Sequence, residues 1–185
     1  MKMIKPVYVY GSPVLRKVAK EIESDYPNLS GLIEDMFETM YNSDGIGLAA
    51  PQVGLPIRLF VVDASPLSED HPEVQDFKKA FINPTIVERS PEVTLYNEGC
   101  LSIPNIREDV ERPESIVIRY VDKDFNEHEE RFDGIAARII QHEYDHLEGI
   151  LFTDKVSSLR RQLLKSKLSA ISKGKFNASY KVKIS

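Results

Sequence analysis

The chain has 185 residues, of which 42% are hydrophobic and 29% charged, and it contains one cysteine, Cys100. This composition suits a single globular domain with a sizeable apolar core and excludes disordered, collagen-like and disulfide-stapled proteins. No apolar run approaches the roughly 20 residues that a membrane-spanning helix needs. Lys5 and Pro6 stand where a signal peptide would need an apolar stretch. The sequence therefore predicts a cytoplasmic protein with no membrane partner.

Charge is distributed unevenly along the chain. Residues 155–185 hold nine of the 24 Lys and Arg residues and no Asp or Glu, so the first 154 residues carry 15 basic against 29 acidic residues. A basic tail on an acidic body suggests an anionic partner for the tail. A solvated helix that offsets the acidic body, or one that packs on it, explains the same charges equally well.

The first half of the chain predicts a helix followed by strands. Residues 13–19 suit a short helical turn, and apolar side chains at three- and four-residue spacing predict a helix over residues 28–41. Residues 45–54 contain three glycines and Pro51 and are typical of a loop. Short apolar strands are expected over residues 58–63 and from residue 80, with a polar surface loop over residues 65–76 between them.

The second half predicts a hairpin and two helices. Strand-like alternation over residues 115–121 is followed by a turn and by residues 127–132, which can pair back. Asp133 offers a cap for a helix over residues 134–147. A further helix over residues 156–171 has an apolar stripe formed by Val156, Leu159, Leu163, Leu164, Leu168 and Ile171. Strands and helices in separate stretches indicate an α+β fold with antiparallel strands around a central helix, plus a C-terminal helix.

The strongest local signal is the HExxH pattern of His142-Glu143-Tyr144-Asp145-His146. On a helix, residues four apart share a face, so both imidazoles can bind one metal ion while Glu143 moves protons for a metal-bound water. The two histidines and Glu143 fall on or beside the apolar arc of the helix, whereas Tyr144 and Asp145 point away from it. Core histidines hydrogen-bonded to backbone are the alternative interpretation.

Two histidines make an incomplete catalytic site, because such sites use three protein ligands. The extended HExxHxxGxxH pattern fails, since Phe152 stands where its last histidine should be. Upstream candidates are Cys100, His71 and His128, and downstream only Asp154 is available, as a weaker candidate. A thiolate suits soft and borderline divalent metals, whereas both upstream histidines lie in polar surroundings. Cys100 is therefore the favoured third ligand.

The glycine-containing segment Gly45-Ile46-Gly47-Leu48-Ala49-Ala50 matches the GxGxxA nucleotide pattern only formally. That pattern requires a preceding strand and a following helix, and here a helix precedes and Pro51 follows. An exposed backbone that pairs with a peptide-like substrate is a better functional interpretation. A plain connection between helix and strand explains the same residues.

Three segments together resemble the motifs of the peptide deformylases, in the order of that family. They are Gly45-Ile46-Gly47-Leu48-Ala49-Ala50-Pro51-Gln52, Glu98-Gly99-Cys100-Leu101-Ser102 and Gln141-His142-Glu143-Tyr144-Asp145-His146-Leu147. The resemblance covers essentially the whole chain and is strongest from Val14 to Phe152. It implies a single catalytic domain over residues 1–185, with residues 155–185 as a basic C-terminal helix and tail.

The resemblance also implies a reaction, namely removal of the N-formyl group from the initiator methionine of nascent polypeptides with release of formate. It implies one divalent metal, Fe(II) in the cell and Zn(II) or Ni(II) in preparations, bound by Cys100, His142 and His146. Metal-bound water would be the nucleophile and Glu143 the general base and acid. The remaining implied roles are oxyanion stabilisation by the Gln52 side chain and the Leu101 N–H, peptide binding by the backbone of Ile46 and Gly47, and a methionine pocket lined by Ile135 and Ile139.

Some deformylases use a C-terminal helix to reach the ribosome, and the basic tail suits a phosphate backbone without recognition of a nucleic-acid sequence. Two other classes remain as alternatives. One is a different metallohydrolase such as a small peptidase, and the other is a protein in which the metal only stabilises the fold. A structural site would normally be closed by a fourth protein ligand, and the sequence offers no obvious one.

Overall fold

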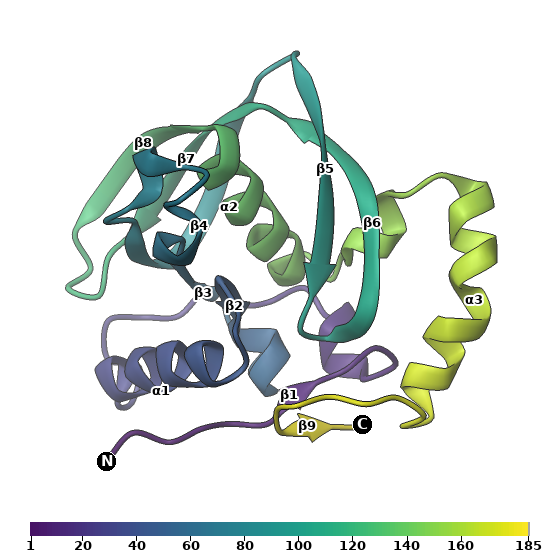
Figure 1. Ribbon diagram of the computed structural model, residues 1–185. Helices are drawn as coiled ribbons and strands as arrows, with labels where there is room; N and C mark the ends of the chain where they lie inside the picture. The colour runs from purple at the N-terminus through teal and green to yellow at the C-terminus, as the bar shows by residue number, and fades with distance from the viewer. Residues whose placement is uncertain (185) are drawn as a thin grey trace.

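The computed structural model describes residues 1–184, and a five-stranded antiparallel sheet forms its centre (Figure 1). The strand order is β2-β3-β4-β7-β8. These strands are β2 (Gly47–Ala49), β3 (Leu59–Asp63), β4 (Lys78–Arg89), β7 (Ser115–Val121) and β8 (Glu127–Asp133). Sequence neighbours β3 and β4, and β7 and β8, pair directly, so most of the sheet is a meander.

The sheet is covered by one helix on each face. Along β3, Phe60 and Val62 join the apolar cluster of helix α2 (Gly134–Leu147), whereas Leu59 and Val61 join that of helix α1 (Leu29–Asn42). This alternation follows from the period of two along a strand. Every residue of β3 is buried, because the strand has one apolar cluster on each of its two faces.

A hairpin of β5 (Val93–Cys100) and β6 (Ile103–Pro113) stands apart from the sheet, and α2 runs between the two (Figure 1). Helix α3 (Ser158–Ser172) packs outside the hairpin, and a third apolar cluster joins them. The chain then returns to pair β9 (Val182–Lys183) in parallel with β1 (Val7–Tyr8). Within residues 1–184, no helix has the length and apolar character needed to cross a membrane.

The expected fold class is confirmed, with antiparallel strands around a central helix and a separate C-terminal helix. Helices α1 and α2 and strands β3, β7 and β8 lie within two residues of their predicted bounds. Strand β4 begins at Lys78, two residues before the expected start, and runs on to Arg89. The turn expected over residues 13–19 is a short 3₁₀ helix, Pro13–Arg16.

The polar surface loop expected over residues 65–76 is confirmed, with two short 3₁₀ helices in it and Val74 as its one buried residue. Two local predictions are wrong in detail. The segment predicted as a loop over residues 45–54 contains strand β2 and the 3₁₀ helix Ala50–Val53. Asp133 precedes α2, but its carboxylate accepts a hydrogen bond from Arg131 Nε at 3.1 Å and makes no side-chain cap.

The β5–β6 hairpin was not predicted, because neither strand shows a clear alternation of apolar and polar residues in the sequence. The first five residues of β5 are exposed, so the strand has no apolar alternation there. Strand β6 does alternate between buried and exposed positions, but two of its buried positions hold Glu108 and Arg112. Buried charges at inward-facing positions hide the periodicity that identifies a strand.

The helices also bury different faces from those expected. Tyr144 and Asp145 are both buried, because α2 is covered by the sheet on one side and by the hairpin on the other. On α3, Leu164, Leu168 and Ile171 are buried, but Leu159 and Leu163 of the predicted stripe are 65% and 58% exposed. The packed face of α3 is therefore narrower than its apolar content indicated.

The packing of α3 predicts opposite outcomes for two adjacent leucines. Leu164→Ala should lower the free energy of unfolding by about 2–5 kcal/mol, because it removes a buried side chain and leaves a cavity. The matched variant Leu163→Ala should change it by no more than about 0.5 kcal/mol, since that side chain is exposed. Urea unfolding of both variants measures the difference, and equal losses would contradict this packing.

Candidate metal centre

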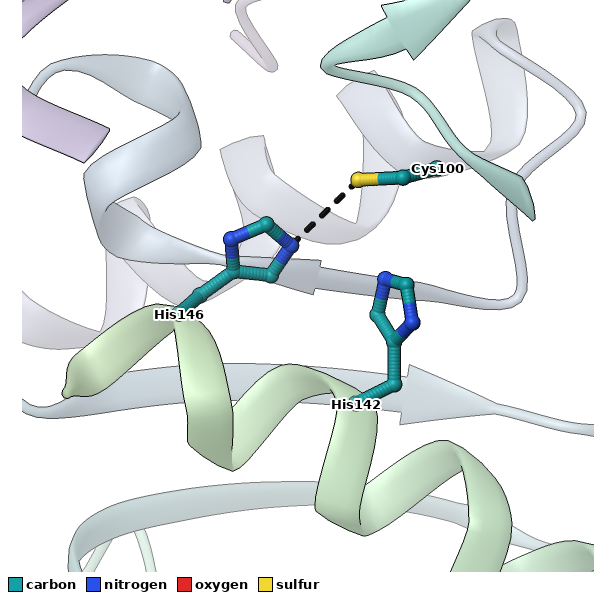
Figure 2. A group of neighbouring side chains, drawn as sticks. All are labelled: Cys100, His142 and His146. Atoms are coloured by element: carbon teal, nitrogen blue, oxygen red, sulfur yellow. Dashed lines mark hydrogen bonds between the residues drawn. The ribbon is translucent and has the colours of Figure 1, made fainter. Parts of the chain in front are cut away.

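Three side chains with metal-binding atoms converge where the hairpin meets α2. Cys100 is the last residue of β5, and His142 and His146 lie one turn apart on α2, with all three facing a common centre (Figure 2). Their ligand atoms lie within 4.8 Å of one another, and Cys100 Sγ is 3.4 Å from His146 Nε2. One sulfur and two imidazole nitrogens suit Zn(II) and other borderline divalent cations.

The orientation of His142 is set by Glu98. His142 Nδ1 lies 2.8 Å from Glu98 Oε1. Because the carboxylate is ionised and can only accept, Nδ1 carries the hydrogen and Nε2 is left free to bind a cation. Burial alone would raise the pKa of Glu98, but hydrogen bonds from His142 and Arg112 outweigh it and hold that pKa well below its usual range.

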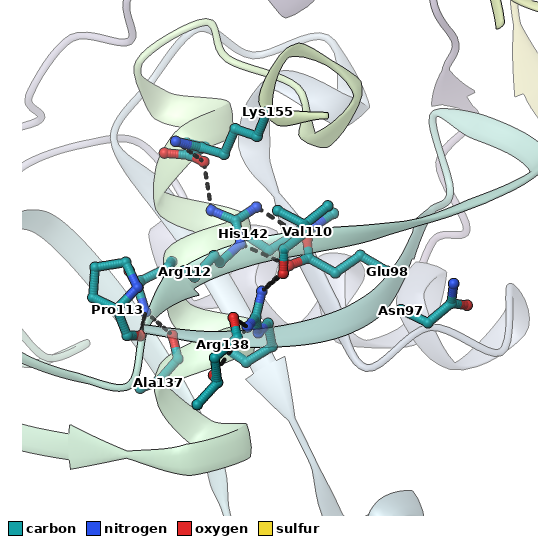
Figure 3. A network of polar contacts seen from close by, with 12 residues as sticks. Asn97, Glu98, Val110, Arg112, Pro113, Ala137, Arg138, His142 and Lys155 are labelled. Atoms are coloured by element: carbon teal, nitrogen blue, oxygen red, sulfur yellow. Dashed lines mark hydrogen bonds and ion pairs between the residues drawn. The ribbon is translucent and has the colours of Figure 1, made fainter. Parts of the chain in front are cut away.

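Glu98 belongs to a buried ionic network between the hairpin and α2 (Figure 3). Its Oε2 accepts hydrogen bonds from Arg112 Nε and Arg138 Nη1, both at 2.7 Å. Arg112 Nη1 donates in turn to Asp145 Oδ2 at 2.7 Å. Two arginines and two carboxylates thus balance inside the protein, and a buried charge of this kind is stable only when it is paired.

Two buried polar atoms beside the three ligands have no protein partner within residues 1–184. They are Glu143 Oε2 and His146 Nδ1. Burial raises the pKa of Glu143 to about 7, against the opposing effect of His142 and Arg112. Gly47 lies directly against this carboxylate, because a Cβ at that position would stand 2.7 Å from Glu143 Oε1. Only glycine leaves room there for the Glu143 carboxylate as it is placed.

Gln52 reaches the centre from the 3₁₀ helix that follows β2. Its Oε1 accepts a hydrogen bond from the Ala49 N–H at 2.9 Å, so its Nε2 points inward. Nε2 then lies 3.1 Å from Ser102 Oγ and 3.5 Å from Cys100 Sγ. The amide orientation is therefore fixed by the Ala49 N–H, and Gln52 presents a hydrogen-bond donor beside the sulfur.

A cleft of about 880 Å³ opens over this centre. Apart from His146, which lies buried behind it, the cleft is lined by every site residue that the sequence indicated: Ile46, Gly47, Gln52, Cys100, Leu101, Ile135, Ile139, His142 and Glu143. The structure thus brings together three segments that are distant in the sequence.

The alternative ligands lie elsewhere and have other partners. His71 pairs with Glu73 at 3.4 Å, and His128 Nε2 lies 2.8 Å from Asp122. Asp154 pairs with Arg16 at 2.6 Å. Phe152, which stands where the extended zinc pattern would have a histidine, stacks on the His142 ring with centroids 6.0 Å apart. The group found within residues 1–184 has no fourth protein ligand, which suits a catalytic site better than a structural one.

Sequence reasoning missed the residues that hold the ligands. Glu98 was noted only as part of a motif, and Arg112, Arg138 and Asp145 were not singled out. A signal existed for one of them, because Arg138 precedes His142 by four residues on α2 and shares its face.

The comparisons with known proteins agree with this geometry. The family profile described as "Polypeptide deformylase" matches residues 4–162. The chain is 54% identical to the peptide deformylase of Christiangramia forsetii, over 98% of this chain and 96% of that one. The relative from Flavobacterium johnsoniae is 53% identical over the same shares.

Solved structures give the same result. A peptide deformylase from Plasmodium falciparum is similar to this chain with a TM-score of 0.81 and 39% identity, covering 91% of this chain and 95% of that one. The enzyme from Thermotoga maritima gives a TM-score of 0.76 at 43% identity, covering 85% and 99%. With its profile match, its close relatives and its fold in agreement, the chain belongs to the peptide deformylase family.

Proposed function

We propose that this cleft hydrolyses the formyl amide of formyl-methionyl polypeptides at a divalent cation held by Cys100, His142 and His146. Deformylases remove the N-formyl group from nascent polypeptides, and membership of the family assigns that reaction to this chain. The observation that carries the proposal is the convergence of three metal-binding atoms within 4.8 Å beside the unpartnered carboxylate of Glu143.

We propose Fe(II) as the cation in the cell, with Zn(II) or Ni(II) occupying the same ligands in preparations. The donor set supports this, because imidazole and thiolate ligands accept all three metals. A bound cation would polarise the formyl oxygen and lower the pKa of water at the site. The residues around it perform the remaining steps.

Glu143 is the proposed general base and acid. Water adds to the formyl carbon and gives a proton to the Glu143 carboxylate, and as the carbon–nitrogen bond breaks that proton passes to the departing amine. Formate and a free amino terminus result. The support is positional, since one oxygen of the carboxylate is buried without a partner among residues 1–184 and the other lies 4.0 Å from His142 Nε2.

Gln52 Nε2 and the Leu101 N–H are the proposed donors to the oxyanion that develops on the formyl oxygen. Donors fixed before the reaction stabilise a transition state more than donors that must reorient. The bond from the Ala49 N–H to Gln52 Oε1 supports this role, because it holds the donor end of the amide at the centre.

The substrate backbone is proposed to bind along Ile46 and Gly47. Strand β2 is an edge strand, since it pairs with β3 on one side and ends the five-stranded sheet on the other. An extended peptide can add to such an edge. Ile135 and Ile139, one turn apart on α2, line the cleft beside it and are the proposed apolar pocket for the methionine side chain.

The basic tail is the proposed contact with the ribosome, which would place the reaction in the cytoplasm. Part of its charge is neutralised by the body, because Lys155 pairs with Asp145 and Arg160 with Glu108. Six of its lysines are exposed and have no ion pair within residues 1–184: Lys165, Lys167, Lys173, Lys175, Lys181 and Lys183. These charges suit a phosphate backbone.

The first prediction tests the reaction and its base together. The protein loaded with Fe(II) or Ni(II) without oxygen should release formate from a formyl-Met peptide and should not cleave unformylated peptides. Glu143→Gln should lower kcat/KM by about 10²–10⁴-fold while it keeps the cation, because it removes proton transfer and preserves shape. The same change at Glu111, an exposed position of β6, is the control.

Formate assays and metal analysis of the three proteins give the answer. No formate from the fully loaded parent would reject the reaction, whereas parental turnover by Glu143→Gln would reject only its base.

The second prediction concerns the carboxylate behind His142. Glu98→Gln should weaken cation binding by about 10–100-fold, because it removes the charge that orients the His142 ring. Glu108→Gln is the matched control, since Glu108 lies opposite Glu98 in the hairpin but pairs with Arg160. Competition for Zn(II) with a coloured chelator measures both affinities, and equal values for the two variants would contradict the role given to Glu98.

The third prediction concerns the basic tail. Replacing Lys165 and Lys167 by Gln should weaken binding to ribosomes and make its dependence on salt less steep, by about one unit of log–log slope for each phosphate that the tail no longer binds. The same replacements at Lys17 and Lys20, exposed lysines of the body, should leave binding unchanged. Sedimentation across a salt series separates the two pairs. Equal binding of both variants would reject the tail as the contact.

A further inference from the structure

The chain after α3 returns to the mouth of the cleft. Phe176 and Val182 pack on the same apolar cluster as Cys100, and β9 pairs with β1 beyond them. Between these two anchors, the four residues Asn177–Tyr180 line the cleft. The Asn177 carbonyl also accepts a hydrogen bond from Asn105 Nδ2 at 2.9 Å. This C-terminal segment, residues 176–182, is therefore fixed along its length and forms one wall of the site.

Tyr180 makes a specific contact from this segment. Its hydroxyl donates a hydrogen bond to the Leu101 carbonyl at 2.6 Å. The neighbouring Ser102 carbonyl accepts one from the Tyr10 N–H at 2.8 Å, close to the other end of the chain. Two segments that are remote in sequence thus hold the two consecutive carbonyls of one turn.

That turn has little support from its own hairpin. Leu101 and Ser102 are its two central residues, because Cys100 pairs with Ile103. The register then shifts, so that Gly99 pairs with Arg107 and the intervening residues of β6 bulge out. A bulge interrupts the ladder. The central peptide of such a turn can rotate between the common turn types, and an outside hydrogen bond to its carbonyl selects one orientation.

The same turn carries three groups of the proposed site. Cys100 precedes it as a ligand, the Leu101 N–H is a proposed oxyanion donor, and Ser102 Oγ lies 3.1 Å from Gln52 Nε2. The Leu101 side chain is held from the opposite direction, since a Cβ on Gly45 would stand 2.9 Å from Leu101 Cδ1. The Leu101 carbonyl belongs to the peptide that leads into Ser102, so a rotation of that peptide would disturb the contact of Ser102 with Gln52 Nε2 without unfolding the hairpin.

We propose that Tyr180 is a positioning residue for deformylation, which fixes the Leu101–Ser102 peptide through its hydroxyl and so holds Ser102 Oγ against Gln52 Nε2, a donor to the developing oxyanion. The inference rests on the proposed function of Gln52. Tyr180 acts through the turn, and its loss affects the transition state more than substrate binding.

The kinetic test is Tyr180→Phe, which keeps the ring and removes the hydroxyl. In the Ni(II)-loaded protein we expect kcat for a formyl-Met peptide to fall about tenfold with KM nearly unchanged, because small misplacement of a donor is costly. Tyr120→Phe is the control, since it removes a tyrosine hydrogen bond to Glu130 on the β7–β8 hairpin, away from the turn. Parental kcat in Tyr180→Phe, or a loss shared equally by Tyr120→Phe, would overturn the proposal.

A second measurement does not depend on turnover. In the Zn(II)-loaded protein, NMR should show faster hydrogen exchange of the Ser102 amide, which belongs to the peptide that Tyr180 holds, in Tyr180→Phe, with the amides of α2 unchanged. Unchanged exchange at Ser102 would overturn the role of Tyr180 even if kcat fell. Failure of the proposed reaction is distinguishable, because it appears as absent formate release in the parent, whereas failure of this inference leaves formate release by the parent intact.

Discussion

The buried carboxylate of Glu98 is the interaction on which the candidate metal centre depends, because it joins the hairpin to α2. It accepts four hydrogen bonds from Arg112, Arg138 and His142. Removing an anion from water costs several kcal/mol, and such a cost is offset only when the charge is paired and its lone pairs are used. In meeting this requirement, Glu98 fixes the hydrogen of His142 on Nδ1 and turns Nε2 toward Cys100 and His146.

The position of α2 explains why so many polar groups need partners. The helix lies between the sheet and the hairpin, so its polar residues Arg138, Gln141, Glu143, Asp145 and His146 are buried as fully as its isoleucines. The hairpin satisfies Arg138 and Asp145, and the Pro113 carbonyl accepts from Gln141. On α2, the buried side-chain atoms without a partner within residues 1–184 are Glu143 Oε2 and His146 Nδ1, both on residues of the candidate site. The unpartnered polar atoms of this helix therefore gather at that site, whereas its other buried polar side chains have partners.

Prediction from the sequence succeeded where the spacing of nearby residues alone determines the local structure. Apolar spacing located α1 and α2, and the HExxH spacing placed two imidazoles on one face. It failed where a residue's role depends on a distant partner. Arg112 and Glu108 occupy inward positions of β6 that an apolar pattern would have filled, and their partners lie on other elements. Leu159 and Leu163 appear apolar and helical, but nothing within residues 1–184 covers them.

The bulge in β6 links the metal centre to both ends of the described chain. By shifting the register between Gly99 and Cys100, it releases Cys100 from the regular pleat and leaves its sulfur facing α2. The same shift deprives the following turn of ladder hydrogen bonds. Tyr10 and Tyr180 replace them, 92 and 79 residues away from the carbonyls that they bind. The turn that follows the candidate ligand Cys100 is thus stabilised by long-range contacts from segments on both sides of the hairpin in the sequence, rather than by the hairpin alone.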